Sequence, residues 1–220
     1  ARGVSGNLIT YNVLIGEHLK SGLVDEAMCL WKRVHKLGLV PNSMTYSFMI
    51  DGLCKICLLN VAKGLFTKMK MRGLVPTLSD YNSLVASLCK ESSLEQARRV
   101  FQEMRDSNYV PDVVSFNTMI DGLLKAGDVQ YAKELLNEMV QMGQMPDVFT
   151  YTVLINRLSK LGQVDEAKGI FERMVSLGVK PDSHVYDSLL KGVLSEGEAE
   201  EIIDLLRRMA DHGVVLDSKI

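Results

Sequence analysis

The sequence lacks the marks of several large classes of protein. It contains no run of 18 apolar residues, so we expect no membrane-spanning helix and no membrane partner. Only 6% of its residues are aromatic, which does not suggest a deep aromatic pocket. Its four cysteines suit a reducing compartment better than a secreted, disulfide-linked protein. The net charge of −2 is also unlike that of most nucleic-acid-binding domains, which carry a basic face.

No enzymatic motif is present either. The four histidines share no common spacing with each other or with a partner residue. The chain has no H-x-E pattern combined with C-x-x-C, as a zinc deaminase requires, and no glycine-rich phosphate-binding loop. We therefore expect no catalytic residue, no metal site and no cofactor. The chain is not expected to be an enzyme.

Proline is rare, and its positions define a repeat. The only five prolines follow one another at intervals of 35 residues: Pro41, Pro76, Pro111, Pro146 and Pro181. With proline as the penultimate residue, the chain divides into six units: 8–42, 43–77, 78–112, 113–147, 148–182 and 183–217. Residues 1–7 then form the end of a preceding repeat, and residues 218–220 form a short tail. Such a period is typical of a repeat array rather than a single globular core.

Each unit contains two helical patterns in succession. In unit 113–147 the first apolar stripe consists of Phe116, Met119, Ile120, Leu123 and Leu124. Gly127 ends this helix, Asp128 caps the next one, and Pro146 prevents its continuation. One helical hairpin cannot bury both of its stripes, so the hairpins must stack. The sequence predicts an all-α solenoid.

The last unit departs most from the pattern. It has Leu216 in place of proline and Ile202 where the other units have alanine. Terminal repeats of solenoids are often atypical because one face meets water. We expect the array to end here, and we expect the N-terminal side to be a piece cut from a longer array.

The C-x-x-C pattern of Cys54 and Cys57 is a weak signal for a metal or redox site. Cys54 and Cys89 occupy a repeat position that is leucine in other units, such as Leu124. We interpret them as small core residues.

Small polar residues recur at the fifth and last positions of the units. The fifth residue lies in the first turn of the first helix, and the last residue directly precedes the next first helix. Both positions therefore lie on one surface, repeated at each hairpin. The candidate base-reading residues, in pairs, are Asn12 and Asn42, Ser47 and Thr77, Asn82 and Asp112, Asn117 and Asp147, and Thr152 and Asp182. Donors and acceptors at a regular rise can read the edges of successive single-stranded bases.

Capping is the alternative explanation for the last position, because Asn, Thr and Asp are good N-caps. It does not explain asparagine at the fifth position, inside a helix, where its propensity is poor. Lysine recurs at the thirteenth position, as Lys20, Lys55, Lys90, Lys125 and Lys160. A line of lysines could follow RNA phosphates, although the helix dipole alone also favours lysine at a helix C-terminus.

The repeat resembles the pentatricopeptide repeat family. The resemblance is carried by the 35-residue period, Tyr-Asn near the unit start, Asp-Gly-Leu-Cys-Lys at 51–55, Asp-Glu-Ala opening a second helix, and Pro111-Asp112 at a unit end. It covers about 210 of the 220 residues. The unbroken period resembles that of the pure class of the family. The Asp-Gly-Leu-Cys-Lys motif resembles sequences of the fertility-restorer-like branch. The family implies a right-handed superhelical solenoid.

The resemblance also implies a code. In the family the fifth and last residues select one base per repeat, and the RNA runs 5′ to 3′ along the chain. Carried over to this sequence, the pairs imply a core 5′-(C/U)NUUG-3′, with no base assigned to Ser47 and Thr77. The family's base-packing position, the second of each unit, is occupied by Ile9, Met44, Val114 and Phe149.

The sequence therefore predicts a protein that binds single-stranded RNA and acts in the processing, stability or translation of an organelle transcript. A recruited nuclease would supply any catalysis. The resemblance favours the mitochondrion, with the chloroplast as the alternative. A helical-repeat scaffold that binds proteins remains the rival function. An apolar face at an exposed terminal repeat would also allow dimers.

Overall fold

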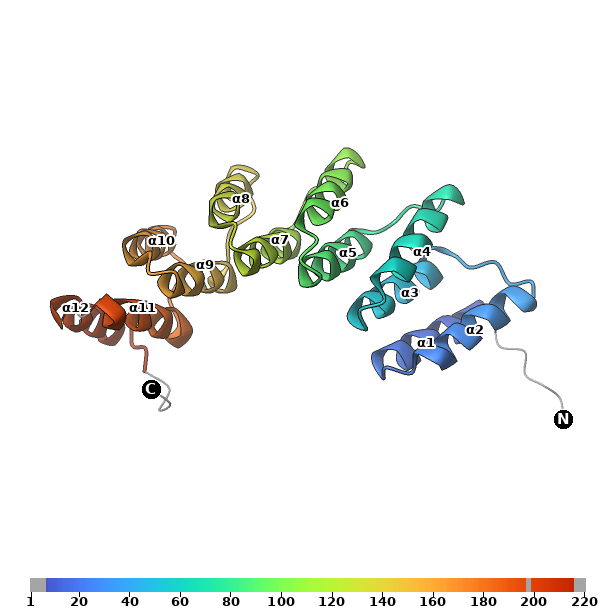
Figure 1. The fold of residues 1–220 in the computed structure, drawn as a ribbon, viewed down its shortest axis with the longest axis horizontal. Coiled ribbons are helices and arrows are strands. Elements are labelled where there is room, and N and C mark those ends of the chain that lie inside the picture. The colour runs from blue at the N-terminus through green and yellow to red at the C-terminus, as the bar shows by residue number, and fades with distance from the viewer. Residues whose placement is uncertain (1–6, 197–198, 216–220) are drawn as a thin grey trace. The chain divides into compact units, whose positions relative to one another are not determined.

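The structure is a computed structural model that describes residues 7–196 and 199–215. Over these residues it has twelve α-helices and no strand, which confirms the predicted all-α fold class (Figure 1). The helices are α1 Leu8–Lys20, α2 Val24–Lys36, α3 Ser43–Lys55, α4 Leu59–Met71, α5 Leu78–Lys90, α6 Leu94–Asp106, α7 Val113–Ala126, α8 Val129–Gln141, α9 Val148–Lys160, α10 Val164–Ser176, α11 Ser183–Glu196 and α12 Ala199–Asp211. The predictions for residues 1–6, Asp217 and 218–220 lie outside the described residues. No described helix is both long and apolar enough to cross a bilayer.

Consecutive helices form hairpins whose turns use left-handed backbone. The odd-numbered helices, α1 to α11, are the first helices, and each begins at the first residue of a predicted unit. Gly127 ends α7 with φ of 90°, a conformation that glycine adopts without a steric penalty. Cys57 and Ser92 adopt positive φ at the equivalent turn position, and Asn108 does so at the end of α6. The turn between the helices of a hairpin therefore depends on backbone geometry that the sequence marks mostly with glycine.

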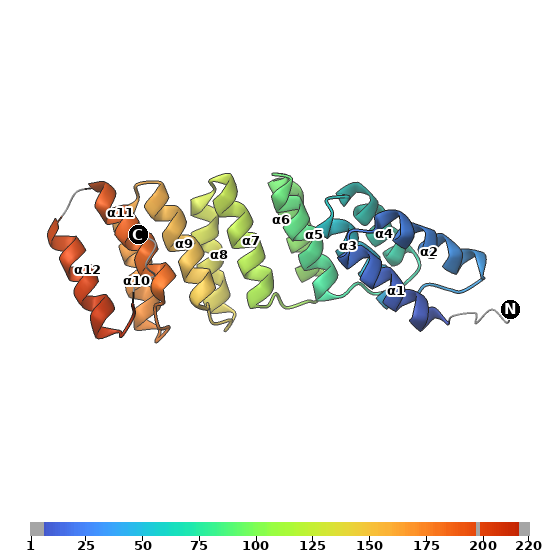
Figure 2. The ribbon, with the colours of Figure 1, turned by 90° about the horizontal axis from the view of Figure 1, so that it is seen from below.

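The chain consists of two compact units, and the boundary between them lies between Pro111 and Asp112. Unit 1 contains α1 to α6, and unit 2 contains α7 to α12. In each unit every second helix packs on the first helix of its own hairpin, and successive first helices pack on each other (Figures 1 and 2). The first helices thus form a row inside each unit, and this row presents the fifth residues of successive repeats at regular intervals.

The core of each unit is built from equivalent residues of successive hairpins. The fourth residue is a buried aromatic ring in all six repeats, and the twentieth is an alanine with no exposed surface in the first five. Trp31 meets Tyr46 edge-on with ring centroids 5.2 Å apart, and Phe171 meets Tyr186 in the same way at 5.5 Å. Such contacts join one hairpin to the next. Leu206 is the exception: it occupies the position of Phe171 but is 40% exposed, because no further hairpin in the described chain covers α12.

Ion pairs cross between successive second helices in both units. Lys70 on α4 meets Glu103 on α6 at 2.5 Å, and Lys133 on α8 meets Glu166 on α10 at 2.5 Å. Each of these partly exposed pairs contributes at most about 1 kcal/mol. They support the stacking of hairpins without determining it.

The two cysteines of the C-x-x-C pattern point into different surroundings. Cys54 is buried on α3, where burial raises the pKa of its thiol to about 12, whereas Cys57 is exposed in the turn. Among the described residues no group of three or more His, Cys, Asp or Glu side chains could hold a metal ion. The structure assigns these residues to the core and to a turn.

Candidate nucleic-acid interface

The last residue of each of the first five repeats caps the next first helix. The N–H groups of Thr45, Asp80, Ser115, Thr150 and Val185 donate, at 2.8 to 3.3 Å, to the side chains of the five candidate last residues: Asn42, Thr77, Asp112, Asp147 and Asp182. Capping, the alternative considered for this position, therefore occurs. A capping carboxylate spends one oxygen on the helix and keeps the second available.

The fifth and last residues meet directly in the repeat 113–147. The Asn117 amide Nδ2 donates to Asp147 Oδ1 at 3.3 Å, and the single hydrogen of the Thr150 hydroxyl is shared between Asn117 Oδ1 at 2.6 Å and Asp147 Oδ1 at 2.8 Å. Burial raises the pKa of Asp147, but hydrogen bonds from Thr150 and Asn117 outweigh it and hold this pKa below its ordinary value. The cluster keeps one amide hydrogen and one carboxylate oxygen free to meet a base.

The fifth and last residues of the repeat 43–77 meet through a third side chain. Ser47 Oγ donates to Asp80 Oδ2 at 2.9 Å, and Thr77 Oγ1 donates to the same oxygen at 3.0 Å. Asp80 is only 1% exposed. The repeat 148–182 differs again, because the Thr152 hydroxyl donates to the Val148 carbonyl of its own helix at 2.7 Å.

Two fifth residues depart from the predicted surface pattern. Asn12 is 2% exposed, unlike the predicted surface side chain, because α1 packs against both α2 and α3; its role in reading the first base of the core stays a prediction. Asn82 is half-buried. The Oδ1 atoms of Asn12 and Asn82 are buried without a hydrogen-bond partner among the described residues. Asn82 and Asp112 belong to different units, so their pairing stays a prediction.

The candidate base-packing residues are exposed apolar side chains. All four lie in the first turn of a first helix and are more than half exposed: Ile9, Met44, Val114 and Phe149. Exposed side chains of this kind at regular intervals can pack on base faces, with about 1 to 3 kcal/mol for aromatic stacking and less for aliphatic contact.

The line of lysines is partly neutralised. Lys55 pairs with Asp51 at 2.6 Å, Lys125 pairs with Asp121 at 2.6 Å, and Lys20 pairs with Glu17 at 2.9 Å. Lys90 and Lys160 have Ala86 and Asn156 four residues earlier and show no such pair in the described part of the chain. The five lysines are therefore not equivalent as candidate phosphate ligands.

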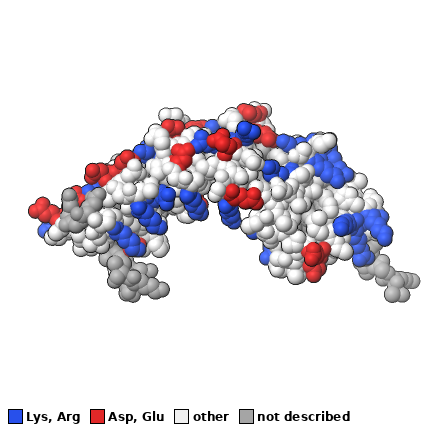
Figure 3. Space-filling view, viewed as in Figure 1, with Lys and Arg blue, Asp and Glu red and all other residues white. Residues whose placement is uncertain are grey.

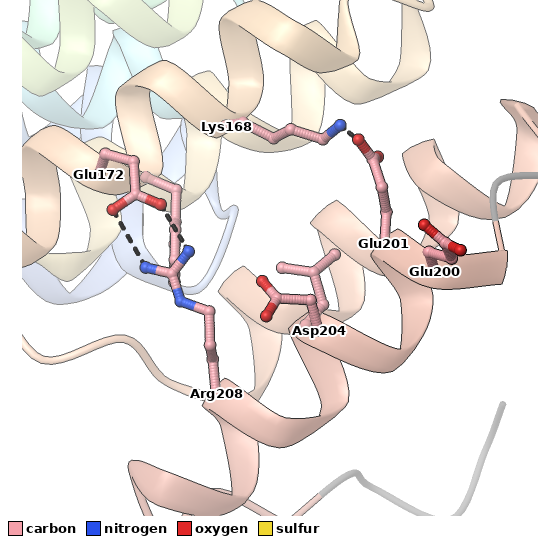
Figure 4. A pocket seen from close by; sticks show the side chains of 8 residues that line it. Lys168, Glu172, Glu200, Glu201, Asp204 and Arg208 are labelled. Atoms are coloured by element: carbon pink, nitrogen blue, oxygen red, sulfur yellow. Dashed lines mark hydrogen bonds and ion pairs between the residues drawn. The ribbon is translucent and has the colours of Figure 1, made fainter.

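Charge is nevertheless sorted between the two sides of unit 2. Figure 3 shows blue side chains mainly along the side that Figure 1 assigns to α7 and α9, and red ones mainly along the side of α8 and α10. A hollow of about 330 Å³ between α10 and α12 is lined by Lys168, Phe171, Glu172, Glu200, Glu201, Asp204, Leu205 and Arg208 (Figure 4). Its two cations pair with Glu201 and Glu172, and two further carboxylates remain. This acidic side would repel phosphate, so the first-helix side is the candidate interface.

The structure also identifies contributors that the sequence reasoning missed. The third residue of a repeat, such as Asp80 or Thr150, contacts the fifth and last residues of the preceding repeat. The signal was available as a capping box, in which the N-cap residue and the residue three positions later bond to each other's backbone N–H.

Comparison with known families identifies the class of protein. The model of the PPR (pentatricopeptide) repeat family matches residues 6–55 and 111–160. Models of the single PPR repeat match residues 44–74, 72–105, 149–179 and 184–214. Together these matches cover most of the chain. The chain therefore belongs to the PPR repeat family, as its sequence predicted.

Solved structures of PPR proteins share the fold. The crystal structure of PPR10 from maize is 27% identical with a TM-score of 0.75, over 99% of this chain and 31% of that one. PPR10 in complex with an 18-nt psaJ RNA element is 29% identical with a TM-score of 0.74, over 90% and 29%. The PPR domain of Arabidopsis thaliana protein-only RNase P 1 in complex with tRNA is 21% identical with a TM-score of 0.67, over 77% and 90%, which supports the fold alone. The chain thus spans about a third of the length of PPR10. No curated protein sequence matches it.

Proposed function

We propose that this chain binds single-stranded RNA in a sequence-specific manner, with one base at each hairpin. The observation that carries the proposal is the cluster of Asn117, Asp147 and Thr150, in which the fifth and last residues of one repeat are held side by side with a donor and an acceptor left over. A uracil presents the complementary acceptor and donor. The RNA complex of the similar protein PPR10 supports the same use of the fold.

The predicted core is 5′-(C/U)NUUG-3′, read 5′ to 3′ along the chain. Only four of the six fifth–last pairs have an assigned base, so the affinity of this chain is expected to be weak. The biological role we propose is the processing, stability or translation of an organelle transcript, in the mitochondrion or alternatively the chloroplast. In that role the chain covers its site, and a recruited nuclease performs any cleavage.

Selection from a random RNA pool tests the proposal. The purified chain should enrich sequences that contain UUG downstream of a pyrimidine, and a fluorescence titration should show about tenfold weaker binding to a scrambled RNA of the same composition. Equal binding of matched and scrambled RNA would favour the rival function of a protein-binding scaffold.

A further inference from the structure

The repeat 43–77 contains a buried carboxylate beside its fifth and last residues. Asp80 is the third residue of α5, a position occupied by Thr45 in α3 and by Thr150 in α9. Its Oδ2 atom accepts hydrogen bonds from the Thr77 backbone N–H at 2.7 Å, the Ser47 hydroxyl at 2.9 Å and the Thr77 hydroxyl at 3.0 Å. These three donors satisfy the Oδ2 atom, although only 1% of the residue is exposed to solvent.

This arrangement fixes what the two hydroxyls can offer a ligand. An ionised carboxylate only accepts hydrogen bonds, so the single hydrogen of Ser47 and the single hydrogen of Thr77 are both directed at Asp80. Thr77 Oγ1 also accepts from the Asp80 N–H at 3.3 Å. The oxygens that remain available to a ligand at this repeat therefore carry lone pairs and no hydrogen.

The repeat 148–182 reaches the same result by another route. The Thr152 hydroxyl donates to the Val148 carbonyl, and Asp182 Oδ1 accepts from the Val185 N–H. This pair also presents acceptors only. The Asn117 and Asp147 pair differs, because the amide keeps a hydrogen to donate. The repeats 43–77 and 148–182 thus present only hydrogen-bond acceptors to a ligand, whereas the repeat 113–147 also presents a donor.

We propose that the repeat 43–77 selects guanine and that Asp80 is the positioning residue responsible. Guanine presents two adjacent donors, N1–H and the N2 amino group, on its Watson–Crick edge. Adenine and cytosine place an unprotonated ring nitrogen against the acceptors, and uracil offers one donor between two carbonyl oxygens. The proposal rests on the proposed function and extends its core to 5′-(C/U)GUUG-3′.

Replacing Asp80 by threonine should reverse this preference. In α9 the Thr150 hydroxyl donates to the oxygen of the fifth residue of the preceding repeat. Asp80→Thr would place the same hydroxyl beside Ser47, so the Ser47 oxygen would accept and its own hydrogen would be free. The edge would then present a donor, which suits the N1 acceptor of adenine. The substituted threonine can still serve in the helix cap, as Thr45 does in α3.

The test measures binding of the whole chain to four RNAs that differ only at the second base of the core. The unchanged chain should bind the guanine RNA about tenfold more tightly than the adenine RNA, the discrimination of one mismatched contact. Asp80→Thr should abolish or invert this ratio, while the preference for uracil at the fourth base stays unchanged. Ser47→Ala keeps Asp80 and its cap contact, and should lose the guanine preference even if Asp80→Thr fails to fold.

The outcomes separate this proposal from the one on which it rests. A chain that reads uracil at the fourth base but binds the guanine and adenine RNAs equally would overturn the role of Asp80 and leave RNA binding intact. A uniform loss of affinity for all four RNAs in Asp80→Thr, with the ratio between them preserved, would show that Asp80 serves only the structure. Failure to bind any matched RNA would overturn both proposals.

Discussion

At the scale of single residues, hydrogen bonds within the protein determine which atoms of a polar side chain are available to a ligand. Thr150 shows this clearly, because its one hydroxyl contacts both members of the pair in the preceding repeat. Side chains of the same type therefore differ in what they offer. Asn12 is buried with an unsatisfied oxygen, whereas Asn117 is held by two neighbours and keeps one hydrogen free. The identities of the fifth and last residues therefore do not by themselves determine which hydrogen-bond donors and acceptors a base would meet.

Replacing Thr152 by asparagine should change the preferred fifth base of the core from guanine to uracil. The Thr152 hydroxyl donates to its own helix and so offers only an acceptor, whereas an amide would supply a donor beside Asp182, as Asn117 does beside Asp147. We expect a swing of about tenfold in the ratio of affinities for the two RNAs. Fluorescence anisotropy with the guanine and uracil RNAs measures it.

Thr152→Ser is the matched control and should keep the guanine preference. Adding Val185→Thr to Thr152→Asn would supply the hydroxyl that Thr150 supplies to Asn117, and should strengthen the uracil preference. If Thr152→Asn binds the two RNAs in the original ratio, the fifth residue does not select the base at this repeat.

Asp147 should make the stability of unit 2 depend on pH. Its folded-state pKa is held below the ordinary value, so the ionised group stabilises the fold at neutral pH. This contribution is complete above the ordinary pKa of the carboxyl and disappears as the pH falls through the lowered folded-state pKa. At neutral pH, Asp147→Ala should cost about 1 kcal/mol through loss of the N-cap.

Urea unfolding from neutral to strongly acidic pH measures this dependence. Asp147→Asn keeps an oxygen for the cap but cannot ionise, so its curve should lack the part of the acid loss that Asp147 causes. A wild-type chain whose unfolding midpoint tracks that of Asp147→Asn at every pH would contradict the assignment.

At the scale of helices, close approach depends on residues without side chains. Gly52 lies on α3, where a Cβ atom would come within 2.5 Å of the Leu19 side chain on α1. Real Cβ contacts are not that short, so a larger residue must push the two first helices apart or displace Leu19. Gly64 lies on α4, and a Cβ atom there would meet nothing within 4 Å.

The two glycines should therefore respond in opposite directions to alanine. Gly52→Ala should destabilise unit 1 by about 1 to 3 kcal/mol, as overpacking does in other cores. Gly64→Ala should stabilise it by about 0.5 to 1 kcal/mol, because alanine is the better helix former. Chemical unfolding followed by circular dichroism compares the two. Equal effects of both substitutions would show that α1 yields to the added methyl group without cost.

At the scale of the whole chain, the sequence predicted the hairpins well because their signals are local. The 35-residue spacing of proline, the glycine that ends α7 and the Asp128 cap of α8 are all read from neighbouring residues. The binding edge was harder to predict because it depends on contacts between repeats. Nothing local indicates that Asp80 holds both Ser47 and Thr77, or that Asn12 is buried.

The ion pairs of the lysines could be predicted less directly than the hairpins but more directly than the binding edge. Asp51 precedes Lys55 by four residues, a spacing that places both side chains on one helix face. That ion pair could have been read from the sequence. It means that the apparent line of five positive charges contains members of two kinds, and the salt dependence of binding by the whole chain distinguishes them.

Lys90 and Lys160 should contribute more to phosphate binding than Lys55 and Lys125. The latter two already pair with Asp51 and Asp121 at 2.6 Å, so phosphate must compete with a carboxylate for each ammonium group. Each phosphate contact to single-stranded RNA steepens the dependence of log K on log salt by about 0.7. Lys90→Gln and Lys160→Gln should each flatten the slope by about this amount.

The matched substitutions Lys55→Gln and Lys125→Gln should change the slope by less, because in the unchanged chain each ammonium group is already paired with an aspartate and contributes less to phosphate binding. Each substitution also releases an aspartate that repels RNA. The affinity of these two variants for RNA at low salt should consequently fall at least as far as the change in their slope predicts. Titrations of one matched RNA at four or five salt concentrations give all of these slopes. Identical slopes for the four variants would mean that the ion pairs open on binding without a cost, and unchanged slopes throughout would place the phosphates away from the thirteenth position.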